Sequence, residues 1–246
     1  MSPLVRWRAA AAIVGVALVT TGCELPRFGI PDSATEQGDG IQKLWSGFFL
    51  AACAVALLVY VLLIYVLVRY RRRPTDDELP SQSGYHIPLE ITYTAIPIVI
   101  VAVLFAFSTM VERDVTDVKP DPDVRIEVIG FQWGWQFRYQ DDDFTVTAPA
   151  GEPPEMVLPE GERARLRLQT VDVNHSFWVI DFLSKRDLIP GVDNVIDVTP
   201  TRTGSFVGRC AEFCGLDHWT MDFEVQAMSQ ADFQSWLASK KAERST

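Results

Sequence analysis

Residues 44–68 read LWSGFFLAACAVALLVYVLLIYVLV and contain no charged side chain. A second stretch, residues 91–111, reads ITYTAIPIVIVAVLFAFSTMV and is also uncharged. Each stretch exceeds the roughly 18 uncharged residues that indicate a helix long enough to cross the hydrocarbon core of a membrane. Together they predict a transmembrane helical hairpin over residues 44–111.

The connection between the two spans begins with four arginines, Arg69, Arg71, Arg72 and Arg73. Loops rich in arginine and lysine stay in the cytoplasm. The first span then runs inward, the second runs outward, and the chain after about Val111 lies outside the cytoplasm. We therefore expect a multi-pass protein of the cell membrane with an extracytoplasmic C-terminal domain.

Residues 1–22 have the composition of a secretory signal peptide. Two arginines precede a run of small and apolar residues at 9–21, which is too short to span a membrane but typical of a signal core. Residues 20–23 read TTGC, so small residues stand directly before a cysteine. This pattern resembles a bacterial lipoprotein signal, in which Cys23 is lipidated and becomes the mature N-terminus. An ordinary signal or an uncleaved anchor is the alternative.

The remaining segments predict a lead-in and a β domain. Residues 23–43 contain Pro, Gly and acidic residues, and predict a flexible lead-in to the hairpin. Within residues 112–246, short stretches of alternating or apolar residues are separated by turn clusters, as in a β-sandwich or barrel. A last amphipathic segment, Gln230–Lys241, follows Ser229 as N-cap and predicts a short helix. The expected strands are 124–128, 144–147, 164–168, 177–180, 194–198, 205–207 and 222–225.

The acidic charge is confined to the second half of the chain. Residues 1–110 carry 8 basic and 8 acidic side chains, whereas residues 111–246 carry 14 and 24, which accounts for the whole net charge of −10. This balance argues against a nucleic-acid partner, because phosphates need a surface rich in lysine and arginine. It suits a cationic protein partner, although plain solubility explains it equally.

The residues that carry chemistry are concentrated in residues 210–221, which read CAEFCGLDHWTM. Two cysteines four positions apart are followed by a histidine and a methionine, and His175 lies upstream between two expected strands. Thiolate, imidazole and thioether ligands together select copper over magnesium, calcium or manganese. This stretch therefore predicts a copper site.

Simpler sites account for only part of this set. A disulfide between Cys210 and Cys214 is credible outside the cytoplasm, but it would leave His175, His218 and Met221 unexplained. A zinc site has enough ligands in two cysteines and two histidines, yet it has no use for the methionine. A mononuclear blue-copper site uses one cysteine rather than two. Two copper ions bridged by both thiolates would use every residue, with one main-chain carbonyl.

The motif Cys-x-Glu-x-Cys-Gly-x-x-His-x-x-Met, with Asn-His-Ser upstream, resembles the CuA site of cytochrome c oxidase subunit II. The resemblance includes the hairpin, the aromatic segment 130–139 (GFQWGWQFRY) and residues 187–191 (DLIPG), and it points to actinobacterial members. It implies a membrane α + β fold. In that fold the two-helix transmembrane hairpin precedes an extracytoplasmic cupredoxin-like β-sandwich, the CuA domain at 112–246, and a short C-terminal helix.

The same resemblance implies the site residues. Two copper ions would be bound by His175, Cys210, the Glu212 main-chain carbonyl, Cys214, His218 and Met221. The Glu212 carboxylate would ligate a magnesium ion shared with subunit I, and Trp133 would be the point at which electrons enter from cytochrome c. Glu90 would take up protons from the cytoplasm at the mouth of a proton channel. The residues alone favour a simpler interpretation, in which Glu90 is a carboxylate at a helix N-terminus.

The implied function is that of an enzyme subunit, an oxidoreductase and translocase. Electrons from cytochrome c, or from a cytochrome c domain, would pass through CuA to haem in subunit I, where oxygen is reduced to water and protons are translocated. The partners would be subunit I, the other oxidase subunits and the membrane. Asp141, Asp142 and Asp143 follow the aromatic segment and are the acidic residues expected to steer the cytochrome toward Trp133.

Two other functions remain as alternatives. A quinol oxidase subunit II shares the hairpin and the sandwich but lacks the copper ligands, all of which this chain carries. A membrane-tethered copper-binding protein usually places ligands for one copper and needs neither Glu90 nor the tryptophans. The visible and near-infrared spectrum of the protein separates the three functions.

Overall fold

The computed structural model describes residues 27–71 and 82–244. The predicted signal peptide and Cys23 therefore lie outside the described residues. The described residues divide into two units, which are described separately: one lies within 43–112, and the second is formed by 113–244 with 27–42.

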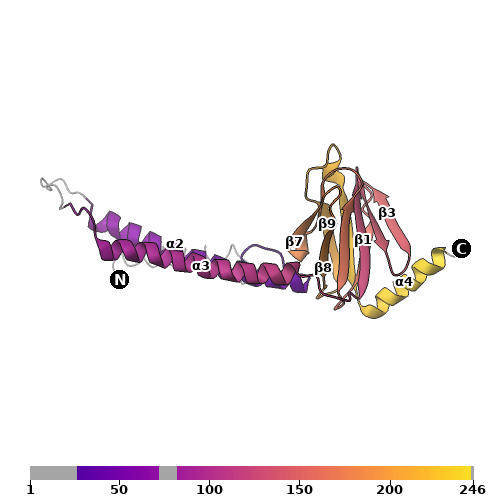
Figure 1. Ribbon diagram of the computed structural model, residues 1–246, viewed down its shortest axis with the longest axis horizontal. Coiled ribbons are helices and arrows are strands. Elements are labelled where there is room, and N and C mark those ends of the chain that lie inside the picture. Colours follow the sequence, from indigo (N-terminus) through magenta and orange to yellow (C-terminus); the bar gives the residue numbers. More distant parts are fainter. Residues whose placement is uncertain (1–26, 72–81, 245–246) are drawn as a thin grey trace, which may run out of the picture. The chain divides into compact units, whose positions relative to one another are not determined.

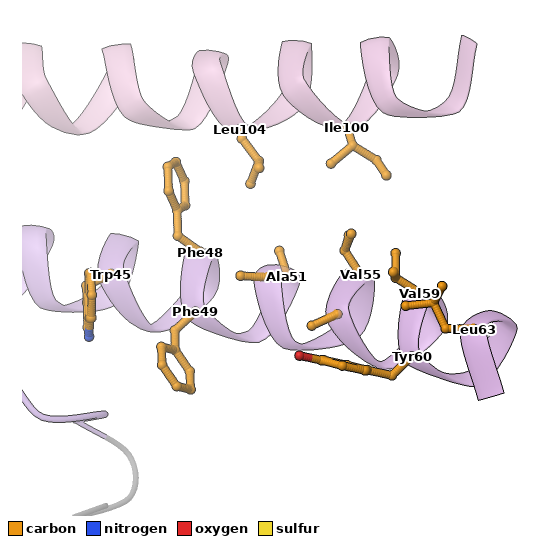
Figure 2. Close-up of a pocket in the computed structure, with 12 residues that line it drawn as sticks. Trp45, Phe48, Phe49, Ala51, Val55, Val59, Tyr60, Leu63, Ile100 and Leu104 are labelled. Carbon is orange, nitrogen blue, oxygen red and sulfur yellow. The ribbon is translucent and has the colours of Figure 1, made fainter. Parts of the chain in front are cut away.

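The predicted hairpin is confirmed by two helices, α2 (Glu36–Arg69) and α3 (Ile87–Thr116), each long and apolar enough to cross a membrane. Both helices extend beyond the uncharged stretches, because charged side chains are tolerated where a span leaves the hydrocarbon layer. An apolar groove of 790 Å³ runs along α2 from Trp45 to Leu63. Figure 2 shows Ile100 and Leu104 of α3 directed toward this groove.

The extracytoplasmic unit is a β-sandwich of two five-stranded sheets, followed by the helix α4 (Gln230–Arg244) (Figure 1). The sheet orders are β3-β2-β1-β5-β8 and β4-β10-β9-β6-β7, with parallel pairs β1–β5 and β4–β10. Two short 3₁₀ helices lie between strands: η1 (Ile180–Phe182) follows β6, and η2 (His218–Thr220) precedes β10. The strands are β1 (Val124–Phe131), β2 (Gly134–Tyr139), β3 (Phe144–Pro149), β4 (Glu155–Pro159), β5 (Ala164–Thr170), β6 (His175–Val179), β7 (Ser184–Leu188), β8 (Asn194–Val198), β9 (Gly204–Cys210) and β10 (Asp222–Met228).

Alternation along the strands fills the space between the two sheets. Trp135, Phe137 and Tyr139 point inward from β2, and Phe177 of β6 stacks on Phe223 of β10 at 4.8 Å between ring centroids. All seven expected strands are present, and three further strands, β2, β4 and β7, were not predicted. The helix α4 begins as expected, because Ser229 Oγ accepts a hydrogen bond from the Asp232 main-chain N (3.2 Å).

One end of the sandwich gathers the ends of several strands that are distant in sequence. Strand β9 ends at Cys210, β10 begins just after Met221, and β6 begins at His175. Because β6 and β9 pair antiparallel, with Phe177 opposite Cys210, the start of one strand meets the end of the other. The end of β1 reaches the same place, since a Cβ on Gly130 would lie 3.1 Å from His175 Cγ.

The expected flexible lead-in differs from the structure. Ala34 and Thr35 are buried against the sandwich. The Ala34 main-chain N donates to the Asp181 carbonyl (2.8 Å), and the Ala34 carbonyl accepts from the Thr201 N (2.9 Å). These long-range hydrogen bonds, which composition does not reveal, make the segment before α2 part of the sandwich. Experiments on this domain therefore need the full chain rather than a fragment that starts at residue 112.

Candidate metal centre

Four candidate donor groups converge on two cysteine sulfurs, which makes six donors in all. Cys210 Sγ lies 3.9 Å from Cys214 Sγ, too far for a disulfide bond, and both cysteines are free. Cys210 Sγ lies 3.8 Å from His175 Nδ1 and 3.3 Å from the Glu212 carbonyl. Cys214 Sγ lies 3.5 Å from His218 Nδ1 and 3.8 Å from Met221 Sδ. The structure thus brings together every ligand atom that the sequence predicted.

Four of the side chains at this site are buried. His175 is fully buried, and Cys210, Cys214 and Met221 are each less than a tenth exposed. His175, Cys210 and Cys214 form a cluster able to hold a metal ion, with ligand atoms within 4.8 Å of one another. Buried sulfur and imidazole donors in such a cluster are suited to a soft or borderline metal.

A negative charge on the Cys210 sulfur opposes a second negative charge on the Cys214 sulfur. Burial acts to raise the pKa of both thiols. In Cys210, hydrogen bonds led by the one from His175 outweigh burial, and the pKa falls below its ordinary value. In Cys214, the charge of Cys210 adds to burial and the pKa rises. Bound metal cations would stabilise both thiolates at once, so the residues fit a thiolate-bridged metal centre and release protons when they bind it.

Asp172 holds His175 from the side opposite the sulfurs. Its Oδ1 lies 3.0 Å from His175 Nε2, and its Oδ2 accepts a hydrogen bond from the Gln132 main-chain N (2.7 Å). Burial acts to raise the pKa of Asp172, but hydrogen bonds from His175, Val173 and Gln132 outweigh it and lower the pKa. The ionised carboxylate favours a proton on Nε2, so Nδ1, which faces Cys210 Sγ, is the nitrogen that would bind a metal ion in place of a proton. Sequence reasoning missed Asp172; its signal was a carboxylate three residues before the ligand histidine.

Replacing Asp172 by Asn is expected to lower metal affinity about tenfold, as is usual when the partner of a ligand histidine is lost. His175 and Gln132 bond different oxygens of Asp172, and asparagine carries an NH₂ group in place of one of them, so one of the two hydrogen bonds is lost. The measurement is transfer of copper from the full-length protein to a chelator. Asp141→Asn is the control, because Asp141 pairs with Arg125 (3.3 Å) beyond the far end of β2. Equal affinities in the two variants would contradict an orienting role for Asp172.

Trp133 is half-buried and contacts the ligand loop directly. Its indole Nε1 donates to the Cys214 carbonyl (3.1 Å), which also accepts from Gln132 Nε2 (2.7 Å). Gly215 has φ +124°, and a Cβ there would lie 2.9 Å from Trp133 Cζ2. A side chain at position 215 would therefore push the tryptophan away from the loop. Trp135, by contrast, is fully buried between the sheets.

The expectation that Asp141, Asp142 and Asp143 surround Trp133 is wrong. These residues form the turn between β2 and β3, and the whole of β2 separates them from Trp133. Asp142 also pairs with Lys241 (2.6 Å). An acidic residue nearer to Trp133 is Glu152, in the turn where the Ala150 N donates to the Trp133 carbonyl (2.6 Å). Hairpin pairing, rather than sequence proximity, decides which carboxylates are neighbours.

The two predicted glutamates, Glu212 and Glu90, lie in different parts of the fold. The Glu212 carbonyl faces Cys210 Sγ, while its side chain is half-buried in the ligand loop. Glu90 lies in the first turn of α3, where its Oε1 accepts a hydrogen bond from the His86 main-chain N (2.9 Å). Glu90 therefore stabilises a helix N-terminus, as the simpler interpretation of the sequence predicted.

Two family models match this chain. The model described as cytochrome C oxidase subunit II, transmembrane domain, matches residues 24–111. The model described as cytochrome C oxidase subunit II, periplasmic domain, matches residues 152–228.

Individual proteins are also similar to this chain. The probable cytochrome c oxidase subunit 2 of Streptomyces avermitilis is 37% identical, over 96% of this chain and 87% of the relative. The cytochrome c oxidase subunit 2 of Mycobacterium bovis is 33% identical, over 96% of this chain and 82% of the relative. The crystal structure of the periplasmic domain of subunit II of cytochrome oxidase of Bradyrhizobium japonicum aligns with a TM-score of 0.46 and 31% identity, over 51% of this chain and 99% of that one.

Proposed function

Because the chain belongs to the cytochrome c oxidase subunit II family, we propose that it is the subunit through which electrons enter a cytochrome c oxidase. The chain is a membrane protein whose C-terminal domain lies outside the cytoplasm. In this proposal the domain accepts electrons from cytochrome c, or from a cytochrome c domain, and passes them to haem in subunit I. Oxygen reduction to water and proton translocation then occur in the oxidase complex.

The observation that carries the proposal is the convergence of four donors on the sulfurs of Cys210 and Cys214. His175, Cys210, the Glu212 carbonyl, Cys214, His218 and Met221 would hold two copper ions. A tetrahedral zinc site would leave the Met221 thioether and the Glu212 carbonyl without a role, although both lie within 4 Å of a cysteine sulfur. A dinuclear copper centre would supply one-electron transfer with little change in geometry. A copper-free quinol oxidase subunit would have no need of these ligands.

The chain's own residues would guide the electron into the site. Trp133 is half-buried at the copper end of the sandwich, and its hydrogen bond to the Cys214 carbonyl joins the protein surface to a ligand residue. Asp172 holds both His175 and the backbone of Gln132, so one carboxylate fixes a ligand and the residue before Trp133. We infer that Glu212 contributes its carboxylate to a magnesium ion shared with subunit I.

The test is the metal content and spectrum of the full-length protein purified in its oxidase complex. The proposal requires two copper ions per chain, with the visible and near-infrared bands of a thiolate-bridged pair. One copper per chain would favour the membrane-tethered copper-binding protein. Zinc, or an absence of copper after native purification, would contradict the proposal.

We further propose that Glu90 takes up protons from the cytoplasm. Glu90→Gln is expected to slow oxidase turnover severalfold while electron transfer into the copper site stays fast, because glutamine still accepts the hydrogen bond from the His86 N but cannot carry a proton. Glu90→Ala removes both the hydrogen-bond acceptor and the ionisable group, so its comparison with Glu90→Gln measures how much turnover depends on the helix cap. Turnover of Glu90→Gln equal to that of the unaltered oxidase would leave Glu90 as a helix-capping residue alone.

Lipidation of Cys23 also stands as a proposal, motivated by residues 20–23. The mature chain should then begin at Cys23 and carry the added mass of acyl chains. In Cys23→Ala, that mass should be absent while α2 and α3 still anchor the protein in the membrane. Mass spectrometry of the purified subunit decides the matter, and an intact Met1 would contradict lipidation without affecting the copper site.

A further inference from the structure

A second tryptophan is directed at the ligand loop from inside the core. Trp135, in β2, is fully buried, and its indole Nε1 donates a hydrogen bond to the main-chain carbonyl of Met221 (3.1 Å). The same carbonyl accepts a hydrogen bond from the Cys210 N (3.1 Å). A single carbonyl oxygen therefore ties the first and last residues of the ligand loop together and joins both to the opposite sheet.

Met221 depends on such support more than the other ligands. Its backbone, at φ −84° and ψ 62°, lies between η2 and β10 and belongs to no helix or strand. Methionine has three freely rotating side-chain bonds, and its thioether is a weak ligand that does not fix its own position. The place of Met221 Sδ, 3.8 Å from Cys214 Sγ, is therefore set by where the backbone is held.

The indole is itself held rigidly on three sides. Its ring lies 5.0 Å from the ring of Phe223 and 6.3 Å from that of Phe177, in edge-to-face contacts. It also lies 6.3 Å from the ring of His175. Aromatic packing of this kind fixes the donor N–H in direction as well as in place. Trp133 and Trp135 thus hold different parts of the loop, since Trp133 bonds the Cys214 carbonyl.

We propose that Trp135 is a positioning residue that holds Met221 against the copper pair and thereby sets the reduction potential of the bound copper. This inference rests on the proposed function. Loss of the indole N–H would leave the Met221 carbonyl with one donor and allow the thioether to move away. A more distant thioether donates less charge to oxidised copper, so the reduction potential should rise.

The experiment compares Trp135→Phe with Trp236→Phe in the full-length protein. Phenylalanine keeps an aromatic ring against Phe177 and Phe223 but has no N–H. Trp236 packs on Tyr139 and Phe144 of the same sandwich, so its replacement controls for lost aromatic volume. Both variants should bind two copper ions. Trp135→Phe alone should raise the reduction potential, alter the copper hyperfine pattern and release copper to a chelator about fivefold faster, the effect of one ordinary hydrogen bond.

Equal potentials and equal copper release in the two variants would overturn the inference while leaving the proposed function intact. An unaltered protein without two copper ions would instead overturn the proposed function. If Trp135→Phe fails to fold, benzothienylalanine at position 135 replaces it, because sulfur takes the place of the N–H in a ring of nearly the same shape. That substitution should give the same rise in potential, and an unchanged potential would refute the role of Trp135.

Discussion

Cys214→Ser is expected to abolish the dinuclear copper centre and to slow electron transfer through the chain by more than about 100-fold. Loss of a residue that only orients a metal ligand costs up to about 100-fold in metal affinity or activity, so loss of a ligand itself should cost more. Cys214 Sγ is the sulfur next to both His218 and Met221, as well as to Cys210. A serine hydroxyl is a hard donor that stays protonated at neutral pH, so it cannot bridge two soft metal ions. Copper content, the near-infrared spectrum and the rate of reduction measure the loss.

The matched control is Cys53→Ser, which makes the same change within α2. This variant should keep both copper ions and the unaltered spectrum. Serine is close to cysteine in size, so the sandwich should remain folded in both variants, and near-ultraviolet circular dichroism checks this. Two copper ions with an unaltered spectrum in Cys214→Ser would show that the thiolates do not form a bridged pair.

Trp133→Ala is expected to slow electron arrival at the copper site by about 100-fold, within the range found when a central interface tryptophan is lost. The variant removes the half-buried aromatic surface and its hydrogen bond to the Cys214 carbonyl. The slowing should be nearly equal at low and high salt, because the lost element is the contact through which the electron moves. Stopped-flow reduction of the oxidase by its cytochrome, repeated across salt concentrations, gives the rates.

Charge acts on the same step in a different way. Glu152→Gln, next to Trp133, should slow reduction mainly at low salt, because steering by charge falls steeply with ionic strength. Asp142→Asn, at the far end of β2, should leave the rate unchanged and serves as the control. Normal reduction in Trp133→Ala would remove its proposed role. Reduction rates that do not change with salt concentration in any variant would mean that the cytochrome donor is permanently attached to the oxidase. That outcome would not affect the proposed role of Trp133.

The sequence alone determined the hairpin and most of the candidate metal centre. A membrane span depends on length and absence of charge, and both properties are visible in residues 44–68 and 91–111. Five of the six donors lie within residues 210–221, and in so short a loop the spacing of the side chains limits how far apart they can be. The sequence also revealed seven of the ten strands. It missed β4 and β7, which carry no clear alternation, and β2, whose alternating Trp135, Phe137 and Tyr139 were noted only as an aromatic segment.

Tertiary structure decided what lies around that loop. His175 is 35 residues before Cys210 and reaches it only because β6 pairs with β9. The two tryptophans have different surroundings because Trp135 lies within β2 with its side chain in the core, whereas Trp133 lies in the turn before β2 and stays half-buried. Gln132 and Ala34 have no distinctive spacing, and their importance arises from hydrogen bonds to distant segments. Such contacts follow from strand register and sheet packing, which depend on the burial of the whole apolar core rather than on any local pattern.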